Sequence, residues 1–541
     1  MSDTARFAVL IADELSPRAN EILRAHPEID VVSQLGLKGD ELIKAINDRK
    51  VRALAVRSAT KVTSAVFEAC PSLEVVGRAG IGVDNIDVKA ASRRGVIVMN
   101  TPSGNAVTTA EHAIALLVSM ARRVPQATAS MKAGKWEKKK FQGTELMDKT
   151  LGVLGLGNIG RIVADRAQGL KMKVIASDPV LTEEMAKRMG VELVAFDEVL
   201  RRADFITVHT PLLPETKNLI GAAAFAKMKD GVFLINAARG GIVDEAALAV
   251  AIQSGKVAGA AFDVFVEEPP AKDGTAAALL ALDQVIATPH LGASTDEAQE
   301  KVAVELAEQI VAFLLRGEVK NAVNLPPLSR EQQTRLSPYV DLATRLGALA
   351  AQMCTGVESI DVELVGDIAE GGGGAAIAAC AVAGLLRPHL DVPVTQVNAM
   401  MLAAERGIRV SSTLRAQGTH FTSSIALRLD GKNVKTKIVK GTIFQTDAGP
   451  EPRIVQIDAF TLEAIPEGRI LVIRNEDKPG VIGAIGTLLG KRGLNVSRMQ
   501  VGLDKAKGEA LQLWNIEGDA AAALDEVRAL AHVRSALVVT L

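Results

Sequence analysis

The sequence is poor in aromatic residues and in cysteine. Only 13 Phe, 2 Trp and 1 Tyr occur among 541 residues, so the cores must be largely aliphatic, as they are around buried parallel sheets. The three cysteines, Cys70, Cys354 and Cys380, are too widely separated for a disulfide framework or a metal knuckle. No other spacing of Cys, His and Asp indicates a metal site. A reducing compartment fits this composition, and we expect a cytoplasmic protein.

The sequence also lacks an excess of either charge and a long apolar run. Lys and Arg total 62 against 63 Asp and Glu, a net charge of −1, which argues against a general nucleic-acid binder. The first 15 residues show no basic region ahead of an apolar core, so we expect no signal peptide. The uncharged run 371–386 is mostly Gly and Ala, too short and too weakly apolar to cross a bilayer. Neither a nucleic acid nor a membrane is expected as a partner.

Short apolar runs separated by helix-length stretches fill the first 320 residues. With 48% hydrophobic and 23% charged residues the chain has the composition of a folded protein, and its length requires several domains. The alternation predicts βαβ units and two doubly wound parallel sheets, an α/β fold of Rossmann type. The predicted strands are 7–12, 52–58, 73–79, 95–100, 150–157, 173–178, 204–210, 231–238, 259–265 and 284–290.

The pattern changes after residue 320. Consecutive prolines in 324–333 predict a linker. Residues 359–463 contain a strand, a Gly/Ala helix and long alternating runs with a hairpin signal at Asp430-Gly431, which indicates an α+β domain. After a second linker, 463–469, residues 470–541 follow the strand–helix–strand–strand–helix–strand order of a ferredoxin-like domain.

A dinucleotide fingerprint follows the fifth predicted strand. Gly155, Gly157 and Gly160 fit G-x-G-x-x-G between a strand and a helix, and Asp178 ends the next strand. The glycines let the backbone approach a pyrophosphate at the helix N-terminus. Asp178 can accept bonds from the ribose hydroxyls and would repel a 2′-phosphate, which favours NAD over NADP. The alternative is a tight turn with a capping aspartate.

Three later segments, each following a predicted strand, carry a candidate catalytic set. Arg239 can bind a carboxylate and polarise the adjacent oxygen, His290 can move a hydroxyl proton, and Glu268 can hold the imidazole tautomer. Taken singly, these are ordinary loop residues. Their joint occurrence beyond a dinucleotide fingerprint indicates hydride transfer between NAD and a hydroxy acid.

Motifs along the whole chain resemble the D-2-hydroxyacid dehydrogenase family and, within it, the long-form phosphoglycerate dehydrogenases. They are VRSATKVT (56–63), GRAGIGVDNID (77–87), NTPSGNAVTTAEH (100–112), GLGNIGR (155–161), HTPLLPET (209–216), NAARGGIVDE (236–245), DVFVEEPP (263–270) and PHLGAST (289–295).

The resemblance implies roles and domain limits. Arg239, Glu268 and His290 would be catalytic, with His290 the acid/base. The NAD contacts would include Asn158, Ile159, Asp178, Thr210, Ala237, Ala238, Arg239, Asp263 and the turn from His290 to Gly292. The domains would be a discontinuous substrate domain (1–100 and 288–318), an NAD-binding domain (101–287), an intervening domain (319–465) and an ACT domain (470–541).

A phosphorylated substrate needs more cations than a simple hydroxy acid does. Arg57 and Arg78 follow strands of the first domain, and in the family both approach the substrate. Gly80 to Gly82 could offer backbone amides to its carboxylate. We add Ser58, Ile81 and Lys138 to the expected substrate site. For Lys138, which lies in the lysine run 135–140, the alternative is an ordinary solvated surface.

The resemblance also bears on the C-terminal third. Asp477 and Asn495 match ACT positions that could hold the amine and carboxylate of L-serine. The alternative is a dimerisation module without ligand. We expect a homodimer or homotetramer.

The expected function is NAD-dependent oxidation of 3-phospho-D-glycerate to 3-phosphooxypyruvate, the first step of L-serine biosynthesis. One alternative is a reductase for glyoxylate, hydroxypyruvate or 2-oxoglutarate, but such enzymes usually end near residue 320. A second is a non-catalytic NAD-sensing scaffold, a class that lacks an ACT-like tail.

Overall fold

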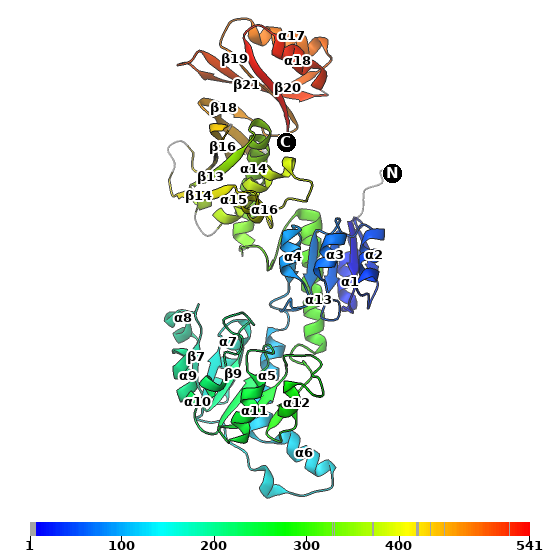
Figure 1. The fold of residues 1–541 in the computed structure, drawn as a ribbon, viewed down its shortest axis with the longest axis vertical. Helices are drawn as coiled ribbons and strands as arrows, with labels where there is room; N and C mark the ends of the chain where they lie inside the picture. Colours follow the sequence, from blue (N-terminus) through cyan, green and yellow to red (C-terminus); the bar gives the residue numbers. More distant parts are fainter. Residues whose placement is uncertain are drawn as a thin grey trace.

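The computed structural model describes residues 7–326, 328, 330–369, 373–417, 421–432, 434–447, 449–518 and 520–541. They form four units, each built on one sheet (Figure 1). The expected fold class is confirmed, with two parallel sheets, then a mixed sheet and an antiparallel one. Within the described residues no helix is long and apolar enough to cross a membrane.

The first unit is a five-stranded parallel sheet in the order β2-β1-β3-β4-β5. Helices α1 and α13 cover one face, while α2, α3 and α4 cover the other. Its strands are β1 (Phe7–Ile11), β2 (Ile29–Ser33), β3 (Ala53–Val56), β4 (Val75–Arg78) and β5 (Ile97–Asn100). Its helices are α1 (Pro17–Arg24), α2 (Asp40–Asp48), α3 (Ser64–Ala69), α4 (Val88–Arg93) and α13 (Asp296–Arg316). The long helix α13 thus returns to the first sheet after the second unit.

The second unit is a seven-stranded parallel sheet in the order β12-β11-β10-β9-β6-β7-β8. Helices pack on both faces, and β9 is fully buried as central parallel strands are. Its strands are β6 (Thr150–Leu154), β7 (Lys173–Ser177), β8 (Glu192–Leu193), β9 (Phe205–Val208), β10 (Val232–Asn236), β11 (Val257–Phe262) and β12 (Val285–Ala287). Its helices are α5 (Ala106–Ala121), α6 (Val124–Lys132), η1 (Lys138–Phe141), α7 (Asn158–Gly169), α8 (Glu183–Arg188), α9 (Phe196–Arg202), α10 (Ala222–Lys227), α11 (Glu245–Gln253) and α12 (Thr275–Leu280).

The third unit has a mixed sheet in the order β14-β13-β15-β16-β17-β18. Its elements are α14 (Arg330–Met353), β13 (Val357–Val365), η2 (Asp367–Ala369), α15 (Gly374–Leu386), η3 (Arg387–His389), α16 (Ala399–Glu405), β14 (Arg409–Arg415), β15 (Ser424–Gly431), β16 (Val434–Thr446), β17 (Gly449–Ile457) and β18 (Phe460–Ala464). The expected hairpin forms between β15 and β16. The expected linker 324–333 is shorter than predicted, because α14 begins at Arg330.

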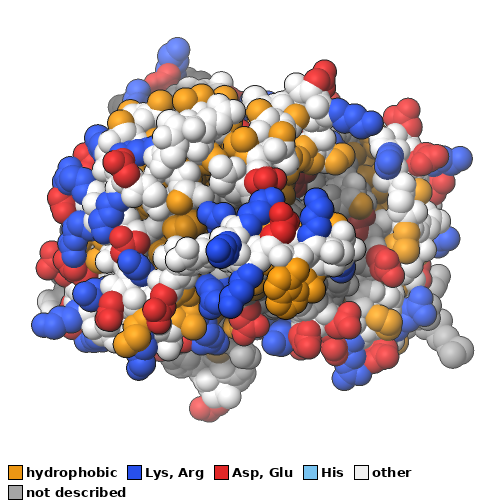
Figure 2. Space-filling view, turned by 90° about the horizontal axis from the view of Figure 1, so that it is seen from below, with side chains coloured by type: hydrophobic (Ala, Val, Ile, Leu, Met, Phe, Trp, Pro, Cys, Tyr) orange, Lys and Arg blue, Asp and Glu red, His pale blue; other side chains and the backbone are white. Residues whose placement is uncertain are grey.

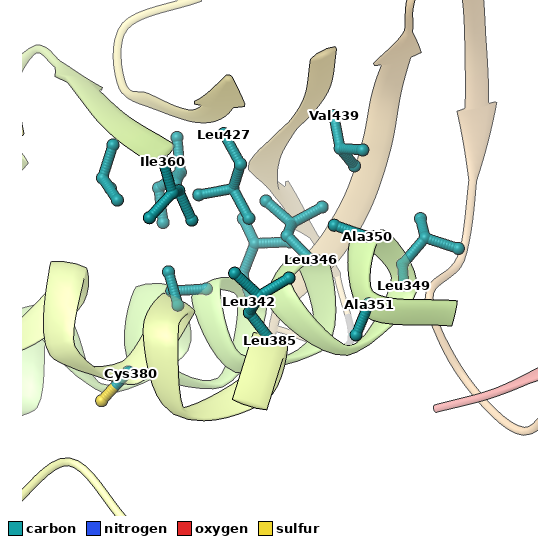
Figure 3. Packing of buried hydrophobic residues seen from close by; sticks show 14 of the residues in the cluster. Leu342, Leu346, Leu349, Ala350, Ala351, Ile360, Cys380, Leu385, Leu427 and Val439 are labelled. Carbon is teal, nitrogen blue, oxygen red and sulfur yellow. The ribbon is translucent and has the colours of Figure 1, made fainter. Parts of the chain in front are cut away.

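The fourth unit is an antiparallel sheet in the order β20-β21-β19-β22 with two helices on one face. Its elements follow the order predicted for a ferredoxin-like fold: β19 (Arg469–Glu476), α17 (Val481–Lys491), β20 (Asn495–Asp504), β21 (Glu509–Glu517), α18 (Ala521–Ala529) and β22 (Val533–Thr540). The other face of this sheet joins the core of the third unit. In that core, Leu342 and Leu346 of α14 and Leu385 of α15 lie on the helices that face the strands (Figure 3). The third and fourth units therefore share one continuous hydrophobic core.

Charged side chains of both signs are interspersed on the face seen in Figure 2, which views the molecule from the α6 end. Apolar side chains form several groups between them.

Candidate active site

The candidate site is a cavity of about 440 Å³ between the first and second units. Residues of both units line it, together with the segment that follows β12. Among the residues expected from sequence, the lining includes Arg78, Ile81, Gly82, Asn158, Ile159, Thr210, Ala237, Ala238, Arg239, Asp263, His290 and Gly292.

The topology explains why these residues meet. In an open parallel sheet, ligands bind beyond the carboxyl ends of the strands, where the strand order reverses. In the second unit the reversal lies between β6 and β9, and the fingerprint follows β6. In the first unit it lies between β1 and β3, which Asp13 and Arg57 follow. The Asp13 carboxylate accepts bonds from the Arg57 N–H at 2.6 Å and the Thr60 hydroxyl at 2.6 Å, which fixes the loop after β3.

The fingerprint turn is built for close backbone approach. A β-carbon at Gly160 would lie 2.0 Å from the carbonyl oxygen of Gly155, so only glycine fits there. Helix α7 begins at Asn158, and its first backbone N–H groups are free of intrahelical partners by geometry. A pyrophosphate is the anion that such a turn and helix terminus accommodate.

Asp178 lies at the end of β7 and is anchored by backbone amides. Its carboxylate accepts bonds from the N–H groups of Leu156 (2.8 Å), Val180 (2.9 Å) and Leu181 (3.1 Å). Burial raises the pKa of Asp178, but these three bonds outweigh it and hold the pKa below its usual value. The carboxylate is therefore ionised at neutral pH, as discrimination against a 2′-phosphate requires.

Among the described residues, three polar side-chain atoms at the lining are buried without a partner: Oδ1 of Asn105, Nδ1 of His209 and Oγ1 of Thr210. Burial lowers the pKa of His209 to about 4, so its ring is neutral. Its Nε2 lies 2.9 Å from the Thr207 hydroxyl. Buried polar atoms are nearly always paired in proteins, so these three atoms are suited to a ligand that fills the cavity. The residues present thus fit NAD.

The candidate catalytic residues His290 and Glu268 are hydrogen-bonded to each other. His290 Nδ1 lies 2.7 Å from Glu268 Oε2, and Glu268 Oε1 accepts the N–H of Phe265 at 3.1 Å. Burial raises the pKa of Glu268, whereas the bonds from His290 and Phe265 and the charge of Arg239 lower it below the usual value. An ionised Glu268 fixes the proton on Nδ1, and Nε2 is left as the ring nitrogen for a substrate.

Two guanidinium groups from two units, those of Arg78 and Arg239, line the cavity with His290. Arg57 is not among the lining residues, but its charge acts on Arg78. Arg239 bonds through Nε to Asp84 at 3.1 Å and lies against the backbone of Gly82. Arg78 donates from Nε to the carbonyl oxygen of Arg57 at 3.2 Å. Burial and the charge of Arg239 lower the pKa of Arg78 to about 10, with Arg57 adding to the effect and Asp84 opposing it. Arg78 therefore remains a cation at neutral pH, although two neighbouring cations, Arg239 and Arg57, disfavour its charge.

Some expected residues lie beside or away from the cavity. Ser58 is exposed after β3. Gly80 lies close to the Arg78 guanidinium, since a β-carbon on Gly80 would be 2.3 Å from Nη1 of Arg78. Lys138 lies in η1, beyond α6, at the end of the second unit that faces away from the first unit (Figure 1). Asp477 and Asn495 are exposed in the fourth unit, where the Asn495 amide donates to Glu517 at 3.1 Å.

Sequence reasoning also missed several residues at the cavity. Asn105 and Thr109 line it, and His112 contacts Asp263 behind it. Thr288 bridges the last two residues. The available signal was that Asn105, Thr109 and His112 belong to the motif NTPSGNAVTTAEH, which runs from the end of β5 into α5.

The chain matches three family models in succession. Residues 114–292 match the NAD-binding domain of D-isomer specific 2-hydroxyacid dehydrogenases, 335–458 the D-3-phosphoglycerate dehydrogenase intervening domain, and 469–531 the ACT domain. Among solved structures, it is similar to a glyoxylate reductase from Paecilomyes thermophila (TM-score 0.53, 30% identity), covering 59% of this chain and 98% of that one. D-lactate dehydrogenase from Aquifex aeolicus, complexed with NAD and lactic acid, gives a TM-score of 0.52 at 28% identity, covering 59% and 100%.

Full-length relatives extend the match over the last two units. D-3-phosphoglycerate dehydrogenase of Archaeoglobus fulgidus is 43% identical over 506 residues, covering 93% of this chain and 94% of the relative. The Bacillus subtilis enzyme of the same name is 41% identical over 512 residues, covering 94% and 95%. The chain therefore belongs to the D-isomer specific 2-hydroxyacid dehydrogenase family, in its branch of D-3-phosphoglycerate dehydrogenases.

Proposed function

We propose that the protein is an NAD-dependent oxidoreductase that converts 3-phospho-D-glycerate to 3-phosphooxypyruvate, the first reaction of L-serine biosynthesis. The observation that carries the proposal is that Arg78 and Arg239 line the cavity with His290, the partner of Glu268, while the charge of Arg57 acts on Arg78. Mutual repulsion of these cations is relieved by a substrate with several negative charges, such as a phosphorylated carboxylate. A singly charged 2-oxo acid needs fewer of them.

His290 acts as the general base of the oxidation. Its Nε2 accepts the proton of the substrate C2 hydroxyl, while Glu268 stabilises the imidazolium that forms. Arg239 binds the carboxylate and polarises the oxygen at C2 as it becomes a carbonyl. Arg57 and Arg78, with the backbone of Gly80 to Gly82, hold the rest of the anionic substrate. When bound, NAD accepts the hydride that leaves C2.

NAD would lie along the second unit, held by the segment from Gly155 to Gly160, Asp178, Thr210, and the stretch from Ala237 to Arg239. Asp263 and Gly292 would also help to hold it. The unpaired atoms of His209 and Thr210 and the close approach at Gly160 support it. Lys138 lies outside this cavity and would contribute its positive charge to the substrate site from there.

Two other functions fit the chain less well. Reductases for glyoxylate, hydroxypyruvate or 2-oxoglutarate share the first two units, but the similar solved structures cover only 59% of the chain, while the phosphoglycerate dehydrogenases cover nearly all of it. A non-catalytic NAD-sensing scaffold is disfavoured because that class lacks an ACT-like tail, whereas residues 469–531 of this chain match the ACT domain.

The domain limits that we propose are 1–100 with 288–318 for substrate, 101–287 for NAD, 319–465 for the intervening domain and 470–541 for the ACT domain. The packing of α13 on the first sheet supports the discontinuous first domain. L-serine would bind at Asp477 and Asn495 between copies in a homodimer or homotetramer. The three cysteines are free and buried, which fits a cytoplasmic location.

Replacing Arg57 by Glu tests the substrate assignment. We expect KM for 3-phospho-D-glycerate to rise far more than KM for D-glycerate, because only the first carries a phosphate. Equal effects on both substrates would contradict the phosphate role.

Calorimetry with L-serine tests the effector site at Asp477 and Asn495. Absence of heat at millimolar serine, together with unchanged activity, would leave the ACT domain with an assembly role alone.

A further inference from the structure

The chain passes between the first and second units twice, and a small polar cluster joins the two passages. Residues 101–105 lead from β5 into α5, and residues 288–295 lead from β12 into α13. His112 and Thr109 lie one turn apart on α5 and face the second passage. A β-carbon on Gly292 would lie 3.3 Å from Thr109 Cγ2, which shows how closely helix and turn approach.

His112 closes the cluster from the helix side. Its Nε2 lies 3.1 Å from Thr288 Oγ1 and 3.2 Å from Asp263 Oδ1. The Thr288 hydroxyl donates to the same carboxylate oxygen at 2.6 Å. Because an ionised carboxylate only accepts, His112 presents an N–H at Nε2.

Asp263 in turn holds the turn that carries His290. Its Oδ1 accepts the N–H of Leu291 at 2.7 Å, and Oδ2 accepts that of Gly292 at 2.8 Å. The His290 N–H donates to the backbone carbonyl of Asp263 at 2.9 Å. His290 has φ of 54°, a left-handed conformation that is unfavourable for a non-glycine residue and persists only where its surroundings impose it.

We propose that His112 is a positioning residue: through Asp263 and Thr288 it fixes the backbone turn that aims His290 at the substrate and ties that turn to α5. The inference rests on the proposed function. The cluster spans the two passages between the units, so it couples their relative position to the orientation of the acid/base.

The burial of Asp263 makes this support necessary. The residue is only 1% exposed, and an ionised carboxylate at such a site is stable only with several donors. Burial raises the pKa of Asp263, but bonds from His112, Thr288 and Leu291 lower it below its usual value. Without the N–H of His112, the Asp263 carboxylate has fewer hydrogen bonds to compensate its charge. The turn from His290 to Gly292, which this carboxylate holds, can then change its conformation.

The test compares His112→Leu with His112→Gln, which can restore a donor near the position of Nε2. Glu111→Gln, at an exposed position of the same helix, is the matched control. For each variant we would measure kcat, KM, the Kd for NAD by fluorescence titration and the primary isotope effect with C2-deuterated substrate. A misplacement of a catalytic group by about 1 Å costs on the order of a hundredfold in rate.

We expect kcat of His112→Leu to fall about a hundredfold with a larger isotope effect, while the Kd for NAD changes far less because most of the proposed NAD contacts lie outside this turn. His112→Gln should recover most of the rate. A lower melting temperature with unchanged kcat and isotope effect would overturn the proposal. Should His112→Leu fail to fold, Thr288→Val removes the bridging hydroxyl and must show the same pattern. All rates are referred to the wild type on whichever hydroxy acid it oxidises best, so a wrong substrate assignment would appear separately, in the wild type.

Discussion

Replacing Glu268 by Gln isolates the charge behind the acid/base. The variant keeps the length and shape of the side chain but removes a carboxylate 2.7 Å from His290 Nδ1. Glu268 also accepts the N–H of Phe265 through its other oxygen. A glutamine has one amide oxygen, so it can satisfy only one of the two donors, and its NH₂ group faces the other.

The size of the effect follows from the exposure of the pair. The side chains of His290 and Glu268 are 49% and 38% exposed, so solvent screens much of their Coulomb attraction. A hydrogen bond to a charged group contributes about 1.5–3 kcal/mol. If the transition state, in which His290 is an imidazolium, loses stabilisation of that size, kcat falls by about 10- to 150-fold.

Initial rates of NADH formation at saturating substrate measure this loss. Glu267→Gln removes a neighbouring exposed charge and should keep kcat within about twofold of the wild type. Thermal unfolding of both variants separates misfolding from loss of catalysis. A Glu268→Gln variant that keeps the wild-type kcat would refute the role given to this carboxylate.

Three other outcomes follow from the structure. Asp178→Ala should raise kcat/KM for NADP relative to NAD, because the ionised carboxylate that repels a 2′-phosphate is gone; an unchanged ratio would contradict that role. Gly95→Val should lower the melting temperature, with a loss of about 1–3 kcal/mol: Gly95 has φ of 72°, and a β-carbon there would lie 2.8 Å from Thr395 Oγ1 and 3.0 Å from Asn398 Nδ2 in the third unit. The unchanged melting temperature of a folded variant would show that this contact is not formed. The pKa of Asp263 is depressed on folding, so its contribution to stability is complete above the unfolded pKa of about 4 and is lost as pH falls through the folded value. Chemical denaturation from pH 7 to pH 3 should therefore show falling stability only at the acid end, and stability that rises on acidification would contradict the reasoning.

The sequence was sufficient for the elements whose signal is local. The strands from β3 to β7 and from β9 to β12 are short apolar runs, and each was predicted within a few residues. The segment that forms β2 was missed because its partly exposed pattern, with Asp30 and Ser33 at exposed positions, is weaker than that of a central strand. The two-residue β8 is too short to leave any pattern.

Contacts between distant segments were beyond sequence reasoning. His112 gave no signal as a single histidine, and its contact with Asp263 depends on how α5 packs beside the end of β11. The burial of Asn398 against the turn that holds Gly95 depends on how the third unit docks on the first. Likewise, no local feature of the sequence indicates that Lys138 lies away from the cavity of its own chain.

The central claim is that the cavity oxidises a phosphorylated 2-hydroxy acid with NAD. The most direct measurement compares NADH formation from 3-phospho-D-glycerate, D-glycerate, D-lactate and D-2-hydroxyglutarate at neutral pH. Since several hydrogen bonds to a charged phosphate are lost without it, kcat/KM for 3-phospho-D-glycerate should exceed that for D-glycerate by about a hundredfold or more. Equal or faster turnover of an unphosphorylated acid, or no NADH from any of the four, would contradict the account.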